Sequence, residues 1–143
     1  LCSEPSKDEI WETITLNDTP YITKEEESVP MQMKGREVFK FAVKACTDGV
    51  KDLLDEVGID KSNVSYFMIH QANQRIIDSI IKYMGQPSEK FPVNITDHGN
   101  SSSASCPILL DECNRKGMFK KGDILVFSAF GAGLLSGAAV VEW

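Results

Sequence analysis

The chain has 143 residues, 42% of them apolar, which is enough for one domain with an ordinary hydrophobic core. Its net charge of −6 argues against a nucleic-acid partner, since binding a phosphate backbone usually requires a basic face. The longest apolar stretch, residues 129–141, is shorter than the ~20 residues of a membrane span and is interrupted by glycines. Because Leu1 to Ile10 lacks the features of a signal peptide, we expect a cytoplasmic protein with no membrane partner.

The cysteines show neither CxxC spacing nor a companion histidine at the distance typical of a zinc site, so no metal is expected. Scattered thiols in a chain with this much core fit a reducing cytoplasm better than a set of disulfides. The four are Cys2, Cys46, Cys106 and Cys113.

A long amphipathic helix is predicted near the start of the chain. Apolar residues recur near a 3.6-residue period through Gly35–Val57, and Gly58 is a typical helix end. Before this helix, residues 1–33 contain short strand-like pieces such as Ile10–Leu16 and no obvious first element.

The middle of the chain alternates between strand-like runs and segments with helical spacing of apolar residues. The β-branched and aromatic run Val64–Ile69 predicts a buried strand, Gln71–Met84 has helical spacing, and Phe91–Ile95 predicts a short second strand. A further helix is expected to open near Pro107 and to end at Gly117.

Two apolar strands close the chain, Ile124–Phe130 and Leu135–Val141, with a glycine-rich reversal at residues 131–133. The predicted order is therefore β-α-β-α-β-β, preceded by the long helix. Uninterrupted apolar strands indicate a sheet that is covered on both sides, so the expected fold class is α/β, a mixed sheet with helices on both faces.

His70 stands where the first strand passes into a helix. In open α/β sheets ligands bind where strands stop, so this histidine is a candidate for chemistry. Taken alone, it is more readily explained as a histidine satisfied by local hydrogen bonds. A second polar segment, residues 94–105, also lies between a strand-like segment and a helix and contains Asn100.

Three motifs, in this order, resemble the C-terminal half of β-ketoacyl-acyl carrier protein synthase III, a condensing enzyme of the thiolase superfamily. Since members of that family pair two similar halves, the resemblance implies a partial segment over 1–33, cut from a longer fold, and a thiolase-like C-terminal domain over 34–143. The resemblance runs from about residue 31 to the end. Its motifs are His70-Gln71-Ala72-Asn73-x-Arg75-Ile76, Gly99-Asn100-Ser101-Ser102-x-Ala104-Ser105 and Phe130-Gly131-Ala132-Gly133, with Met33-x-Gly35-x-Glu37-Val38-Phe39-Lys40 before them.

The resemblance implies an acyltransferase that condenses an acyl-CoA starter with malonyl-acyl carrier protein, losing carbon dioxide, to initiate fatty acid synthesis without a cofactor. The family active site is a Cys-His-Asn triad, which implies that His70 and Asn100 are its second and third members. Two neutral donors aimed at the thioester oxygen would stabilise the enolate as it forms. The nucleophilic cysteine belongs to the other half, so this chain alone is expected to be inactive.

Further site residues follow from the resemblance. The backbone N–H of Ala132 would form part of an oxyanion hole, although a plain glycine-rich hairpin describes the same residues. The pantetheine arm would contact Arg36, Phe39, Ala72 and Asn73, with Arg36 replacing a residue that is often asparagine. Docking of the acidic carrier protein would involve Lys40, Arg75 and Lys82, although solvated surface charge is an equal explanation for Lys82.

Two residues near Asn100 need separate interpretation. His98 is interpreted as part of the loop structure, with a supporting role at most. Cys106 lies at a helix start, where a thiol pKa can be lowered, but a small packed residue is the favoured interpretation. Cys46 is expected in the core.

The implied partners are an N-terminal half that carries the cysteine, acyl carrier protein, acyl-CoA and a second copy in a homodimer of the complete enzyme. Whether the chain is a fragment, a split subunit or a cleavage product stays open. An apolar face that normally meets the other half would favour association. The alternatives are a synthase III-like enzyme of secondary metabolism and a non-catalytic thiolase-like module for binding or assembly.

Overall fold

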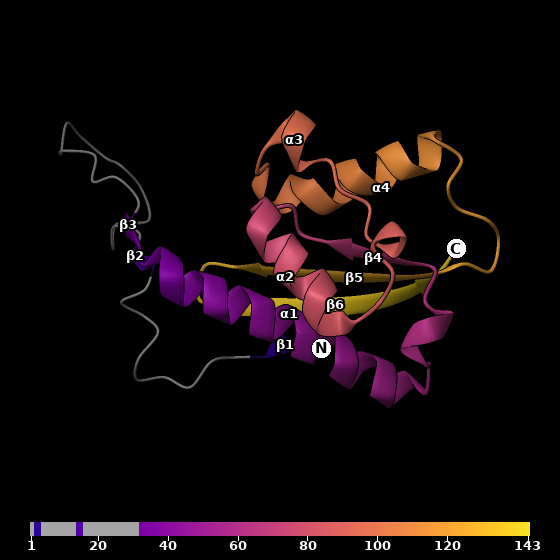
Figure 1. The fold of residues 1–143 in the computed structure, drawn as a ribbon, viewed down its shortest axis with the longest axis horizontal. Coiled ribbons are helices and arrows are strands. Elements are labelled where there is room, and N and C mark those ends of the chain that lie inside the picture. The colour runs from indigo at the N-terminus through magenta and orange to yellow at the C-terminus, as the bar shows by residue number, and fades with distance from the viewer. Residues whose placement is uncertain (1, 4–13, 16–31) are drawn as a thin grey trace, which may run out of the picture.

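The computed structural model describes residues 2–3, 14–15 and 32–143 (Figure 1). Its main sheet has the strand order β1-β6-β5-β4 and is mixed, because β4 and β5 are parallel whereas the other neighbours are antiparallel. The strands are β1 (Cys2–Ser3), β4 (Tyr66–Ile69), β5 (Ile124–Gly131) and β6 (Leu135–Glu142). A separate antiparallel pair joins β2 (Ile14–Thr15) to β3 (Gln32–Met33). The rest of the strand-like piece expected at Ile10–Leu16 lies outside the described residues.

Helix α1 (Gly35–Val57) has the bounds that the sequence predicts. It ends because Gly58 adopts the left-handed conformation, with a φ of 68°, and its N–H turns back to the carbonyl groups of Leu54 and Asp55. Its apolar stripe faces the sheet, where Ala42 and Cys46 are fully buried. The placement of Cys46 in the core is thus confirmed.

Helix α2 (Gln74–Met84) begins three residues later than predicted. The Asn73 side chain accepts a hydrogen bond from the Arg75 N–H at 2.9 Å and caps the helix, which leaves the three residues before Asn73 as a connecting turn. The preceding 3-10 turn η1 (Lys61–Asn63) is followed by β4, which is two residues shorter than the predicted strand. The end of α2 at Gly85, with a φ of 62°, agrees with the prediction.

The strand predicted at Phe91–Ile95 is wrong. The 3-10 turn η2 (Ser88–Lys90) precedes this segment and the short helix α3 (Ile95–His98) takes up its end. Pro92 has no N–H to offer to a sheet. The Asn94 N–H donates to the Gln71 side chain at 3.1 Å, so this backbone group is already satisfied outside the sheet. The predicted order β-α-β-α-β-β therefore loses its second strand, whereas the α/β class is confirmed.

Helices cover both faces of the sheet, as predicted (Figure 1). Successive side chains of a strand point to opposite faces, so Phe67 and Ile69 of β4 pack with α1 and α2, whereas Met68 packs with α4 (Ser105–Arg115). The 3-10 turn η3 (Ser102–Ala104) leads into α4. In the part of the chain described, no helix combines the length and apolar character that crossing a membrane requires.

Candidate active site

A cleft of about 1020 Å³ opens where β4 and β5 end. Four segments line it: the start of α1, the β4–α2 turn, the stretch from Asn100 to the first turn of α4, and the β5–β6 turn. Because β4 and β5 are parallel, their carboxyl ends meet at one edge of the sheet, where ligand sites of open α/β sheets form. His70 lies at this edge because it follows β4, whereas Asn100 reaches it from the loop between α3 and η3, with no strand before it.

His70 is held at the end of β4 by its backbone and its ring. Its N–H donates to the Ser128 carbonyl at 2.9 Å, which extends the β4–β5 ladder by one residue. The ring lies edge-on to Phe130, with 5.3 Å between ring centroids, and only 8% of the residue is exposed. Burial lowers the pKa of the His70 imidazole, so the ring is neutral at neutral pH.

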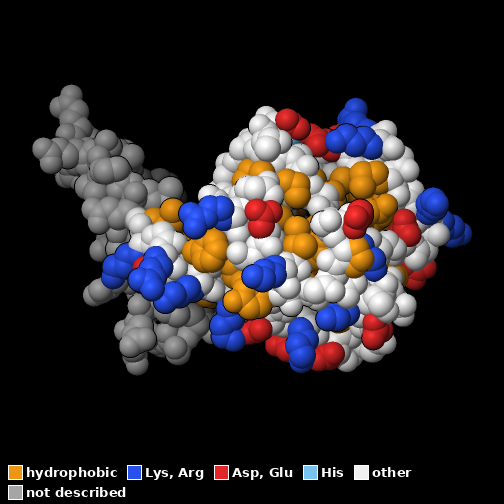
Figure 2. Space-filling model, viewed as in Figure 1, with side chains coloured by type: hydrophobic (Ala, Val, Ile, Leu, Met, Phe, Trp, Pro, Cys, Tyr) orange, Lys and Arg blue, Asp and Glu red, His pale blue; other side chains and the backbone are white. Residues whose placement is uncertain are grey.

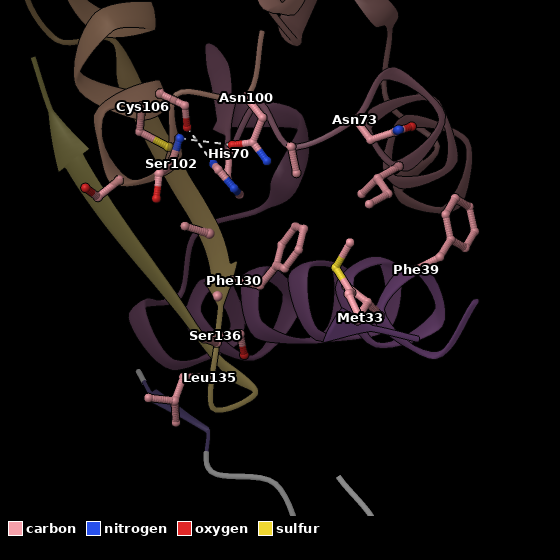
Figure 3. A pocket seen from close by; sticks show the side chains of 18 of the residues that line it. Met33, Phe39, His70, Asn73, Asn100, Ser102, Cys106, Phe130, Leu135 and Ser136 are labelled. Atoms are coloured by element: carbon pink, nitrogen blue, oxygen red, sulfur yellow. Dashed lines mark hydrogen bonds between the residues drawn. The ribbon is translucent and has the colours of Figure 1, made fainter. Parts of the chain in front are cut away.

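Asn100 reaches the same end of the cleft from the loop between α3 and η3 (Figure 3). Its Oδ1 accepts the Ser102 N–H at 3.0 Å, which leaves the amide NH₂ group to donate to a ligand. The loop is sharply bent, since Gly99 has a φ of 64° and Ser102 a φ of 54°. His70 and Asn100 can therefore both present N–H donors to one bound group.

A polar network that the sequence analysis missed anchors the Asn100 loop. The Gln71 amide donates to the Ile69 carbonyl at 2.8 Å and accepts the Asn94 N–H at 3.1 Å. The Asn94 amide donates to Glu112 of α4 at 3.2 Å, and His98 is hydrogen-bonded to the same carboxylate. Hydrogen bonding from His98, then from Asn94, lowers the pKa of Glu112. His98, predicted as part of a loop, is instead the last residue of helix α3, and its contact with Glu112 ties that helix to α4. Polar residues inside apolar runs were the only available signal for Gln71 and Asn94.

The β5–β6 turn borders the cleft through Ala132. Among the described residues, Ser102 is the one non-glycine with a positive φ, so Ala132 has an ordinary backbone conformation that tolerates its methyl group. Gly133 differs, because its φ is 134° and a Cβ there would lie 2.8 Å from the Leu135 Cγ. The turn therefore needs glycine at position 133 and not at position 132.

Of the four residues predicted to contact pantetheine, three line the cleft: Phe39, Ala72 and Asn73. Arg36 is exposed at the start of α1 and is not among the lining residues. Of the three basic residues predicted to dock a carrier protein, Arg75 lines the cleft, while Lys40 and Lys82 are exposed outside it. Figure 2 shows several Lys and Arg side chains over the face formed by α1 and α2.

Cys106 lies in the cleft wall but has the character of a packed thiol. Burial raises its pKa, with a smaller opposing effect from the Ser105 hydroxyl, and the Sγ lies 3.8 Å from the Met68 carbonyl oxygen. Burial also raises the pKa of Cys46 to about 11 and raises that of Cys113. A nucleophilic cysteine needs a lowered pKa, so these three residues lack that property. Within the described residues, no group of three or more His, Cys, Asp or Glu side chains is placed to hold a metal.

Solved structures define the class of fold as that of the thiolase-like condensing enzymes. The chain is similar to 3-oxoacyl-[acyl-carrier-protein] synthase III from Aquifex aeolicus, with a TM-score of 0.86 and 33% identity over 100% of this chain and 43% of the other. It is also similar to β-ketoacyl-[acyl carrier protein] synthase III from Thermus thermophilus, with a TM-score of 0.88 and 32% identity over 100% of this chain and 44% of the other.

The chain belongs to the family described as 3-oxoacyl-[acyl-carrier-protein (ACP)] synthase III C terminal, whose model matches residues 54–143. A curated relative, the β-ketoacyl-[acyl-carrier-protein] synthase III of Clostridium novyi, is 42% identical over 127 residues, which are 88% of this chain and 39% of the relative. The chain thus spans about two fifths of the length of the curated relatives it matches.

Proposed function

We propose that this chain supplies the histidine and asparagine of a β-ketoacyl-acyl carrier protein synthase III, an acyltransferase that condenses an acyl-CoA starter with malonyl-acyl carrier protein. The observation that carries the proposal is the meeting of His70 and Asn100 in one cleft, beside the β5–β6 turn. Membership of the synthase III C-terminal family supports the same function.

His70 and Asn100 would act as neutral hydrogen-bond donors to the malonyl thioester oxygen. When carbon dioxide leaves, negative charge develops on that oxygen, and prearranged donors stabilise it more than they stabilise the ground state. The lowered pKa of His70 supports a neutral donor over a cation. The N–H of Ala132 would serve the acyl group in the same way, as a backbone donor that needs no particular side chain.

The cleft, with a volume of about 1020 Å³, would receive the pantetheine arm of coenzyme A or of a carrier protein. We assign Phe39, Ala72 and Asn73 to this arm, and Arg36 to its outer end, because Arg36 is exposed at the start of α1. The carrier protein, which is acidic in this family, would dock on Arg75 at the cleft with Lys40 and Lys82 beside it, since opposite charges steer such encounters.

The acyl group that the enolate attacks must be held by a cysteine, and the cysteines of this chain have no suitable setting for that role. We propose that it comes from an N-terminal half of the same fold, in an enzyme that is a cytoplasmic homodimer and needs no cofactor beyond its two substrates. The three cysteines whose side chains are described support this division, because burial raises the pKa of each.

The test uses the chain together with its cysteine-bearing half. Incubation with acyl-CoA and malonyl-acyl carrier protein should release carbon dioxide and form a 3-oxoacyl-carrier protein, which mass spectrometry detects. Binding of coenzyme A or carrier protein without carbon dioxide release would indicate a non-catalytic module and would overturn the proposal. Product from an unusual starter would indicate an enzyme of secondary metabolism.

A further inference from the structure

We propose that Ser105 is a positioning residue for His70: its hydroxyl donates a hydrogen bond to Nδ1 and so holds the neutral ring with its proton on Nε2. The consequence for catalysis rests on the proposed function, whereas the position of the proton is a property of the folded chain. In the sequence, Ser105 is the last residue of the Asn100 motif and has no assigned role.

The contact is short and buried. The Ser105 Oγ lies 2.5 Å from the His70 Nδ1, at the first residue of α4, and Ser105 is only 2% exposed. The same Oγ accepts the backbone N–H of Gln71 at 3.2 Å. Ser105 thereby joins the start of α4 to His70 and Gln71, which lie 35 and 34 positions earlier in the chain.

The direction of the hydrogen bond follows from counting protons. The Gln71 N–H can only donate, so the Ser105 oxygen accepts there and still has its own proton to place. If the ring donated from Nδ1, the hydroxyl proton would have to turn to another acceptor, such as the Cys106 sulfur, with which Ser105 also interacts. Sulfur accepts hydrogen bonds weakly, whereas the imidazole nitrogen is a strong acceptor, so donation to Nδ1 is favoured.

The consequence reaches the cleft through the other ring nitrogen. A neutral imidazole carries one proton, and the hydrogen bond at one nitrogen fixes which nitrogen carries it. With Nδ1 accepting from Ser105, the proton is on Nε2, and the ring offers an N–H donor to a substrate oxygen. With the opposite tautomer the ring would present a lone pair there, which would repel a developing oxyanion.

Nuclear magnetic resonance of the 143-residue chain with isotope-labelled histidine tests this directly, because the chemical shifts of the ring nitrogens report the tautomer. His70→Gln identifies the signal by removing it. At neutral pH we expect the wild-type proton on Nε2. Ser105→Ala should shift the tautomer ratio toward Nδ1 protonation about five-fold, the equivalent of a typical net hydrogen bond, and Ser105→Thr, which keeps the hydroxyl, should restore the wild-type ratio.

Two variants make the test specific. Ser128 has another buried hydroxyl, since the residue is only 2% exposed, and its carbonyl accepts the backbone N–H of His70. Ser128→Ala removes this hydroxyl and should leave the tautomer ratio of His70 unchanged. Cys106→Ala removes the competing acceptor and should also leave it unchanged. A wild-type proton on Nδ1, an unchanged ratio in Ser105→Ala, or an equal shift in either control would overturn the proposal.

If Ser105→Ala does not fold, the wild-type spectrum alone decides the proposal. Ser105→Cys, which is of similar size but a weaker donor, should then shift the tautomer ratio toward Nδ1 protonation by a smaller amount. In the enzyme assay, Ser105→Ala should lower kcat for malonyl decarboxylation with little change in KM. If the tautomer is as expected but the wild type releases no carbon dioxide, the proposed function fails and the assignment of the proton stands.

Discussion

His70 and Asn100 lie 30 residues apart in the sequence and reach the cleft from different elements, each with its polar group already oriented. A hydrogen bond on one side of each group fixes the ring of His70 and the amide of Asn100, so the remaining N–H groups can face a ligand without reorganisation. Electrostatic stabilisation depends on such prearranged donors, because they need no reorientation as charge develops on the substrate.

Replacing either donor should therefore affect the chemical step. In the assembly with the cysteine-bearing half, His70→Ala and Asn100→Ala should each lower malonyl decarboxylation by about 10²–10³. Acylation of the cysteine by acyl-CoA should fall less, because this step does not form the malonyl enolate. Radiolabelled carbon dioxide release and the mass of the acylated protein measure the two steps. Wild-type decarboxylation in either variant would remove that residue from the mechanism.

Burial of His70 should also appear in the pH dependence of stability. Its pKa is lowered from 6.5, so between the lowered value and 6.5 the unfolded chain binds more protons than the folded one. Stability therefore rises with pH through this window and is lost as the pH falls below about 6.5. Denaturant unfolding between about pH 5.5 and 7.5 should show this slope.

The variant His70→Gln should have a flatter profile over that range, because glutamine does not titrate. The range avoids the acid window of Glu112, whose pKa is lowered below 4.5 and whose contribution is lost only at more acid pH. The same slope in both proteins would show that His70 is not the group responsible.

At the scale of elements, α2 joins the cleft to the protein surface. Asn73 caps the helix, and Arg75, in the first turn of the helix, lines the cleft. Lys82 is exposed two turns further along the helix. Residues seven apart lie on one side of a helix. The helix can therefore carry positive charge from the cleft mouth outward, on a molecule whose net charge is −6.

Reversing the charge at the cleft mouth should distinguish carrier protein from coenzyme A. Arg75→Glu should lower kcat/KM for the acidic carrier-protein substrate much more than for free acyl-CoA, and the loss should shrink as salt screens the repulsion. Lys121→Glu, an exposed charge change outside the cleft, is the matched control and should leave both values near wild type. An equal loss with both substrates would assign Arg75 to the cleft itself and not to docking.

The β5–β6 turn offers a test of geometry. Gly133→Ala should destabilise the protein by about 1–3 kcal/mol, because an alanine would be strained at this φ and would press on Leu135. Gly131→Ala is the matched control for stability, since its added Cβ meets nothing within 4 Å. Thermal unfolding compares the two variants, and equal stability would show that the turn relaxes without cost.

At the scale of the whole molecule, the chain holds the two proposed donors, His70 and Asn100, whereas burial raises the pKa of the three cysteines whose side chains are described. The relatives that it matches are more than twice as long, and between 28% and 41% of their length is covered. Covalent catalysis requires a nucleophile held near a base and a lowered pKa. The division of the site between this chain and the rest of the fold follows from that requirement.

The isolated chain should accordingly form no acyl-enzyme. After incubation with acyl-CoA, intact-mass measurement should show the unmodified protein, because burial raises the pKa of the Cys106 thiol, the one cysteine in the cleft wall among the described residues. Addition of the cysteine-bearing half should restore acylation and place it on that half. Stoichiometric thioester on Cys106 of the isolated chain would contradict this expectation.

The sequence by itself determined the elements with strong periodicity and the motifs. The 23-residue helix α1, its stop at Gly58, and the final hairpin follow from local patterns, because apolar spacing and glycine act within a few residues. The motifs around His70 and Asn100 were equally local. The place of His70 at the sheet edge was predictable because strand ends gather there, whereas the strand expected before Asn100 is absent.

The tertiary structure alone decided the rest. The apolar spacing of Phe91–Ile95 suits a strand, but the Gln71 side chain, 23 residues away, takes up the Asn94 N–H and removes it from any sheet. Ser105, the partner of the His70 ring, likewise comes from a distant segment, the start of helix α4. Such hydrogen bonds join groups whose proximity is set by packing of the whole chain, so no local pattern of residue types could predict them.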